Sequence, residues 1–104
     1  MVRPPERRLV SRRTPLDDDP LRHIRLRGGK DGLVIDISSV GALVEGPARL
    51  LPGTGIEVQL ATTIGRIIVR CRVVRSYVSG VSAEQVRYRG ALRFEHAVNV
   101  APAG

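Results

Sequence analysis

The sequence has little of what disulfide-rich, zinc-binding and membrane proteins depend on. Aromatic residues make up 3% of its 104 residues, Cys71 is the only cysteine, and Lys30 is the only lysine. A single cysteine excludes a disulfide framework and a cysteine-based zinc cluster within one chain. No apolar run approaches the roughly 20 residues of a membrane span, and the first residues lack the apolar core of a signal peptide. We therefore expect a cytoplasmic protein with no membrane insertion.

Arginine supplies nearly all of the positive charge. Lys and Arg total 17 against 10 Asp and Glu, which gives a net charge of +7, and 16 of the 17 are arginine. Arginine binds phosphate with two parallel hydrogen bonds and also stacks on flat rings, which lysine does not do. The charge therefore predicts an anionic partner, although solubility alone would account for part of the excess. The scarcity of aromatic residues makes nucleic acid unlikely, because single strands are typically bound on aromatic platforms.

The first 20 residues differ in composition from the rest. Residues 1–20 hold five arginines and four prolines and show no apolar periodicity. This composition predicts a flexible, exposed basic arm. Three consecutive aspartates, Asp17 to Asp19, do not share one face of any regular structure, so a solvated turn before Pro20 is favoured over a metal loop. A contact between these aspartates and the neighbouring arginines is the alternative.

From Leu21 onward the pattern is that of β-strands. Short β-branched runs alternate in polarity and are separated by glycine-containing turns, with the longest from about Arg66 to Ser76. Cys71 falls on an apolar position of that run and is expected to be a core thiol. Six such runs without a helical stretch predict an all-β fold, a small six-stranded antiparallel β-barrel over residues 21–97. Residues 98–104 are expected to form a tail with little or no helix.

Two polar clusters carry the candidate chemistry. Alternation predicts Leu33, Ile35 and Ile37 inward and Asp36 and Ser38 outward on one strand. A carboxylate with a nearby hydroxyl suits the N–H edge of a guanine, although an Asp-x-Ser turn is also a common backbone cap. The second cluster is formed by arginines of the arm, which either clamp a phosphorylated ligand or are simply solvated: Arg7, Arg8 and Arg12.

The order and spacing of these clusters resemble the PilZ domain family. The resemblance rests on an Arg-Arg-x-x-x-Arg arm followed by Asp-x-Ser-x-x-Gly and a late GALRF strand, at Arg7, Arg8, Arg12, Asp36, Ser38, Gly41 and residues 90–94. It implies a receptor for the bacterial second messenger cyclic di-GMP. It also implies that Arg8 and Arg12 contact guanine and phosphate with help from Arg7. Asp36 and Ser38 would then hold the other guanine face, while Gly41 keeps the turn open. The arm would become ordered over the ligand and signal to an unidentified protein partner.

Three alternatives stay open beside this prediction. One is a small basic barrel that binds nucleic acid, and another is a PilZ-like adaptor that no longer binds the nucleotide. The third, an enzyme, ranks last because no nucleophile with a base, no metal set and no paired carboxylates occur, so we predict no enzymatic activity, no cofactor and no metal. Two interpretations, a solvated face or an extended ligand surface, also stay open for the outward arginines, Arg66, Arg70, Arg72, Arg87, Arg89 and Arg93.

Overall fold

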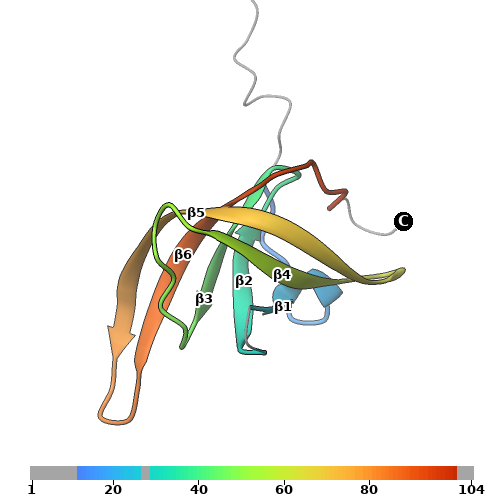
Figure 1. Ribbon diagram of the computed structural model, residues 1–104. Helices are drawn as coiled ribbons and strands as arrows, with labels where there is room; N and C mark the ends of the chain where they lie inside the picture. The colour runs from blue at the N-terminus through green and yellow to red at the C-terminus, as the bar shows by residue number, and fades with distance from the viewer. Residues whose placement is uncertain (1–11, 27–28, 101–104) are drawn as a thin grey trace, which may run out of the picture.

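A computed structural model describes residues 12–26 and 29–100 (Figure 1). The described residues form a 3-10 helix and six strands, in the order η2 (Pro20–Arg22), β1 (His23–Arg25), β2 (Asp31–Ile37), β3 (Gly41–Gly46), β4 (Gly55–Thr62), β5 (Gly65–Val81) and β6 (Val86–Phe94). Neighbouring strands are antiparallel and close into a barrel in the order β1-β2-β3-β6-β5-β4. The predicted six-stranded antiparallel barrel is therefore confirmed. Within the described ranges, no helix has the length and apolarity needed to cross a membrane.

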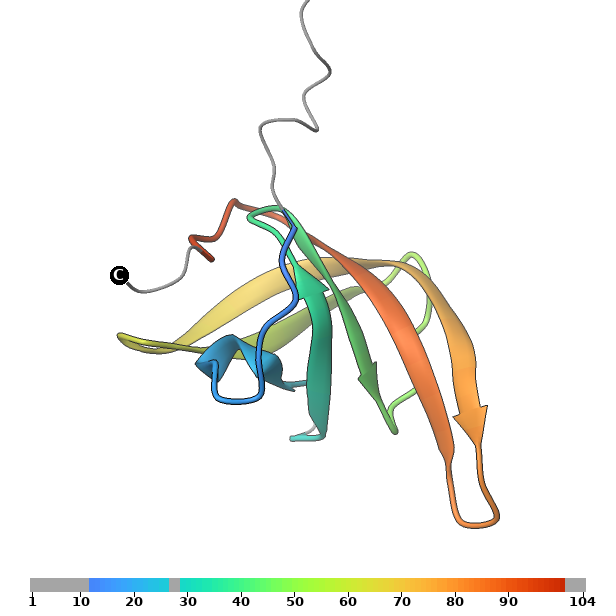
Figure 2. The same ribbon diagram turned by 180° about the vertical axis from the view of Figure 1, so that it is seen from behind.

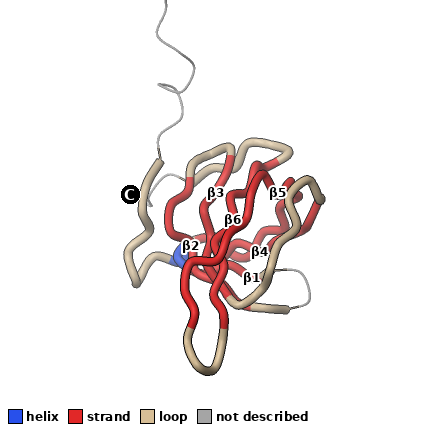
Figure 3. The backbone as a smooth tube through the Cα atoms, turned by 90° about the vertical axis from the view of Figure 1, so that its left-hand side faces the viewer, coloured by secondary structure: helices blue, strands red, loops and turns tan. Residues whose placement is uncertain are grey.

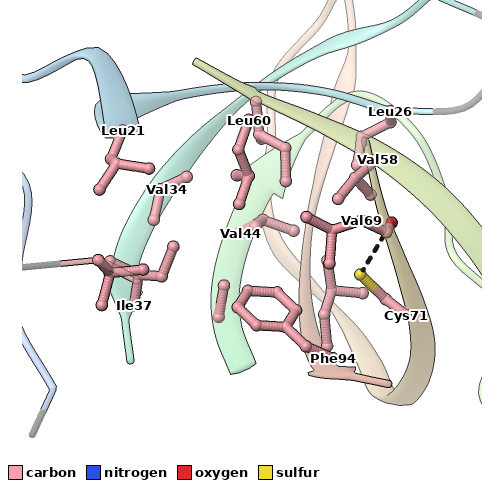
Figure 4. Packing of buried hydrophobic residues seen from close by; sticks show 14 of the residues in the cluster. Leu21, Leu26, Val34, Ile37, Val44, Val58, Leu60, Val69, Cys71 and Phe94 are labelled. Carbon is pink, nitrogen blue, oxygen red and sulfur yellow. Dashed lines mark hydrogen bonds between the residues drawn. The ribbon is translucent and has the colours of Figure 1, made fainter. Parts of the chain in front are cut away.

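The hydrophobic core fills the inside of the barrel. Every second residue along a strand contributes its side chain to this core. In β5, Val69, Cys71 and Val73 are buried while the residues between them are exposed, as the alternation predicts. The same pattern buries Val58 and Leu60 in β4. Figure 4 shows these side chains meeting Phe94 and residues of β2 and β3 inside the barrel. The predicted core thiol is confirmed, because Cys71 is 1% exposed.

Strand β2 breaks the predicted alternation. Val34 is fully buried, whereas Leu33 and Ile35 are only half-buried. The pairing with β3 shifts between Val34 and Asp36, which marks a β-bulge at Ile35. An extra residue in one strand inverts the alternation beyond it. The prediction that Leu33, Ile35 and Ile37 share the inward face is therefore wrong, except for Ile37.

The β5–β6 hairpin is longer than the sequence suggested. The predicted run ends at about Ser76, but β5 continues to Val81. Gly80 pairs with Arg87, and the turn lies beyond Val81. Strand β4 begins opposite Arg72, so the part of β5 beyond Val73 is paired on one side only, with β6. Figures 1 and 3 show this hairpin projecting from the barrel.

The segment before η2 packs against the barrel. Arg13 and Ile37 exchange two backbone hydrogen bonds of 2.9 Å (Figure 2). They add one bridge to the end of β2, beyond Leu33, where the pairing with β1 stops. Pro15, which lies within this segment, is fully buried. The expectation of an exposed arm is therefore wrong for the buried Pro15 and the half-buried Arg13 and Asp19, whereas Leu16, Asp17 and Asp18 are exposed as expected. At the other end, the N–H of Val98 donates to the carbonyl of Ser39 at 2.8 Å, and residues 95–100 contain no helix.

Candidate functional site

Two predicted site residues meet at the end of β2. Asp36 lies on the outside of the barrel, and Nη1 of Arg12 donates a hydrogen bond to its Oδ1, although 24 residues separate them in sequence. The bridge between Arg13 and Ile37 holds the backbone of Arg12 beside the strand. The Arg12 side chain is 58% exposed and that of Asp36 is 29% exposed. A cation and a carboxylate are thus fixed side by side at the barrel surface.

Ser38 does not face outward with Asp36. Its side chain is fully buried, and its hydroxyl accepts from the N–H of Val40 at 3.2 Å and donates to the carbonyl of Gly41 at 3.4 Å. The prediction of an outward Ser38 is wrong, because β2 ends at Ile37 and the chain turns there. The hydroxyl caps the turn between β2 and β3, as the alternative interpretation of Asp-x-Ser proposed. Ser38 therefore fixes the turn that follows Asp36.

Gly41 permits a close contact between two strands. A Cβ at this position would lie 2.4 Å from the carbonyl oxygen of Leu92 on β6. Only glycine leaves room for that approach. The close approach at Gly41 is made by the backbone of β6. The remaining two predicted site residues, Arg7 and Arg8, lie outside the described part of the chain.

Arg13, which the sequence did not single out, anchors the segment that carries Arg12. Its Nη1 lies 2.5 Å from Oδ2 of Asp19, and its Nε donates to the carbonyl of Val100 at 2.6 Å. Asp19 also accepts the N–H of Leu21 at 2.9 Å and so caps η2. Hydrogen bonding from Arg13 lowers the pKa of Asp19 against the opposing effect of burial. The alternative contact between the acidic triplet and a neighbouring arginine is thus confirmed for Asp19, and the complementary charge was its only signal in the sequence.

Several outward arginines are already paired. Glu45 on β3 accepts from Nε of Arg89 at 2.8 Å and from Nε of Arg87 at 3.3 Å. The hydrogen bond from Arg89 lowers the pKa of Glu45; burial opposes it, and Arg87 and Ser79 add to the lowering. Arg70 pairs with Glu57 at 3.4 Å. These arginines belong to surface ion pairs. Fewer of the outward arginines therefore remain available to bind a ligand.

Glu45→Gln should destabilise the barrel in a pH-dependent way. A carboxyl with a lowered pKa stabilises the folded state above its ordinary value of 4.5, and this contribution is lost as the pH falls through the folded-state pKa. We expect a loss of about 1–2 kcal/mol at pH 7 that shrinks in acid. Urea unfolding at pH 7 and pH 3 measures it. Glu57→Gln is the matched control, because its exposed pair with Arg70 contributes only about 0–1 kcal/mol. A loss for Glu45→Gln that does not depend on pH would contradict this account.

The comparison with protein families decides the identity. The model of the PilZ domain family matches residues 11–101. The chain belongs to the PilZ domain family. No curated protein and no solved structure matches it. PilZ domains are receptor and adaptor domains of cyclic di-GMP signalling rather than enzymes.

The PilZ match spans the whole barrel and the site at the end of β2. It includes Arg12, Asp36, Ser38 and Gly41 and begins after Arg7 and Arg8. Among the described residues of this PilZ domain, no three His, Cys, Asp or Glu side chains lie close enough to hold a metal ion. The site combines one exposed cation with one partly exposed carboxylate beside a rigid turn.

Proposed function

We propose that this PilZ domain binds cyclic di-GMP at the outer end of β2, where Arg12 and Asp36 meet. The observation that carries the proposal is their contact on the barrel surface, made by two residues that are 24 positions apart. A guanidinium has five N–H donors, and a carboxylate has two acceptor oxygens, so each retains binding capacity in this pair. The carboxylate suits the N–H edge of a guanine, and the guanidinium suits a phosphate or the face of a base.

The energies favour replacement of the ion pair by a ligand. An ion pair as exposed as Arg12–Asp36 contributes about 0–1 kcal/mol. A charge-assisted hydrogen bond to a ligand contributes about 1.5–3 kcal/mol. Four such contacts at the upper end of this range give about −12 kcal/mol, and a cost of about 4 kcal/mol for association leaves about −8 kcal/mol, which corresponds to a micromolar affinity. The ion pair therefore positions the guanidinium and the carboxylate at the site, and it is weak enough for both groups to bind the ligand instead of each other.

The same arrangement suggests how binding becomes a signal. Arg13 fixes the chain immediately after Arg12 to Asp19 and Val100. In this proposal Arg7 and Arg8 contact the ligand from the preceding arm, so binding draws the arm onto a fixed point of the barrel. A protein partner then meets a changed surface at this end of the molecule. Ser38 and Gly41 contribute by holding the turn.

Titration calorimetry with cyclic di-GMP tests the proposal. Arg12→Gln and Asp36→Asn should each weaken binding about 10-fold to 100-fold, because each removes a charge-assisted contact. Arg70→Gln is the matched control, since it breaks an exposed ion pair on β5 and should leave the affinity unchanged. Circular dichroism should show all three variants folded.

Titration of the wild-type protein with GTP and with a DNA oligonucleotide, beside cyclic di-GMP, separates the alternative functions. If the wild-type protein bound the oligonucleotide with a steep salt dependence and did not bind cyclic di-GMP, a nucleic-acid-binding function would replace the proposal. No binding of either would leave a protein adaptor. Wild-type affinity for cyclic di-GMP in both Arg12→Gln and Asp36→Asn would move the site elsewhere on the barrel.

A further inference from the structure

The outer face beside Asp36 continues across three more strands. Asp36 on β2 lies opposite Leu43 on β3, and Leu43 lies opposite Ala91 on β6. Ala91 in turn lies opposite Arg75 on β5. Leu43 and Ala91 are half-buried and uncharged. An apolar floor therefore separates the Arg12–Asp36 pair from the arginines of β6 and β5. In Figure 2, β6 lies beside β3, and β5 lies on the far side of β6.

The neighbouring row of the same face holds two arginines side by side. Arg93 on β6 lies directly opposite Arg72 on β5, and on its other side it lies opposite Gly41 on β3. Arg72 in turn lies opposite Gly55 on β4. Glycine stands at both ends of this row, so no side chain in it screens the two cations. Like charges directly opposite each other destabilise a sheet.

These two cations differ from the arginines of β6 that pair with Glu45, and Arg75 on β5 shares their lack of a carboxylate partner in the described part of the chain. Neither Arg72 nor Arg93 forms an ion pair with a carboxylate in the described part of the chain, whereas Arg87 and Arg89 share Glu45. Nη1 of Arg72 donates to the carbonyl of Gly53 at 2.7 Å, which fixes the direction of that side chain without neutralising it. Both residues are exposed. An uncompensated cation pair on a rigid sheet is suited to a bound anion.

We propose that Arg93, with Arg72 beside it, is a second anion-binding position of this site and takes a phosphate of cyclic di-GMP. The inference rests on the proposed function and extends its site from β2 to β6. Two strand spacings, about 10 Å, separate Asp36 from the strand of Arg93. A ligand that lies across β3 and β6 covers Gly41, Leu43 and Ala91 and places one phosphate at each side. The site then selects ligands with two phosphates over mononucleotides.

Calorimetry on three variants tests the position. Arg93→Gln should weaken cyclic di-GMP binding about 10-fold or more, and Arg72→Gln by less, because its guanidinium already donates to Gly53. Arg66→Gln, an exposed arginine at the start of β5 opposite Ala61, is the control and should leave the affinity unchanged. Binding of 5′-GMP, followed by NMR, should not change in Arg93→Gln, because one phosphate needs only the Arg12 side.

Stability provides a second readout that does not need a ligand. If Arg93 and Arg72 repel each other, Arg93→Gln should raise or preserve the unfolding midpoint of the ligand-free protein. A lowered midpoint would show that Arg93 is engaged in the fold and would overturn the inference. Wild-type affinity in Arg93→Gln together with weak binding in Arg12→Gln would overturn it while leaving the proposed function intact. Failure of the wild-type protein to bind cyclic di-GMP would overturn both.

Discussion

Replacing Gly41 with alanine is expected to destabilise the barrel by about 3 kcal/mol. The added Cβ would lie 2.4 Å from the carbonyl oxygen of Leu92, far inside van der Waals contact. Both sides of this contact are backbone, and both belong to the paired ladder of β3 and β6. The N–H of Phe94 also donates to the carbonyl of Val40 at 2.8 Å beside it. Relief of the clash therefore requires these strands to separate where they close the core.

Urea unfolding of Gly41→Ala and Gly55→Ala tests this prediction. Gly55 lies in the same row of the barrel, but a Cβ there would approach nothing closer than the carbonyl of Cys71, at 3.8 Å. We expect Gly55→Ala to change the free energy of unfolding by no more than about 0.5 kcal/mol. Equal effects in the two variants would show that strand packing does not explain Gly41. If Gly41→Ala lost ligand binding, its folded fraction would have to be measured first.

Local alternation was sufficient to predict most of the barrel. Strands β4 and β6, and β5 from Ile67 to Val73, place inward apolar residues at every second position, and these residues are buried or half-buried in the structure. Each pattern belongs to a single strand and needs no knowledge of its neighbours. The end of β5 was misjudged because Gly80 signals a turn locally, whereas its pairing with Arg87 continues the hairpin.

Strand β2 could not be predicted in the same way. Leu33, Val34, Ile35 and Ile37 are all apolar, so the sequence supports either face as the buried one. The bulge against β3 decides between them, and it depends on a pairing partner rather than on the strand itself. The outward placement predicted for Ser38 failed for the same reason, because the turn that buries its side chain is set by Gly41 and Val40.

Spacing in sequence predicted only part of the candidate site. It selected Arg12 and Asp36, which the structure brings into contact. It gave no weight to Arg13, whose partners, Asp19 and Val100, come from both ends of the described chain. It also treated the outward arginines as one group. The structure divides this group into three parts. Carboxylates pair with Arg70, Arg87 and Arg89, whereas Arg72 and Arg93 lie opposite each other and Arg66 lies opposite Ala61.

Cys71 should resist alkylation in the folded protein by a factor of at least about 1,000. Desolvation, with a smaller contribution from Glu95, raises the pKa of this thiol from 9.0 to about 12. Only the thiolate reacts with an alkylating reagent, and a rise of about three units leaves roughly one thousandth of the thiolate at pH 8. The side chain is also 1% exposed, and its sulfur donates to the carbonyl of Val69 at 3.6 Å. Modification therefore requires the barrel to open.

Iodoacetamide labelling at pH 8, followed by mass spectrometry, measures this protection against the same protein in 6 M guanidinium chloride. Because labelling reports opening, Gly41→Ala should be modified faster than wild type, and Gly55→Ala at the wild-type rate. The exposed substitution Arg12→Gln should also leave the rate unchanged, because it removes an ion pair outside the core. Rapid labelling of the wild-type protein would mean that β5 separates from β6 without global unfolding. The core would then be buried only part of the time. The sheet surface on which the ligand is proposed to lie would not be rigid either.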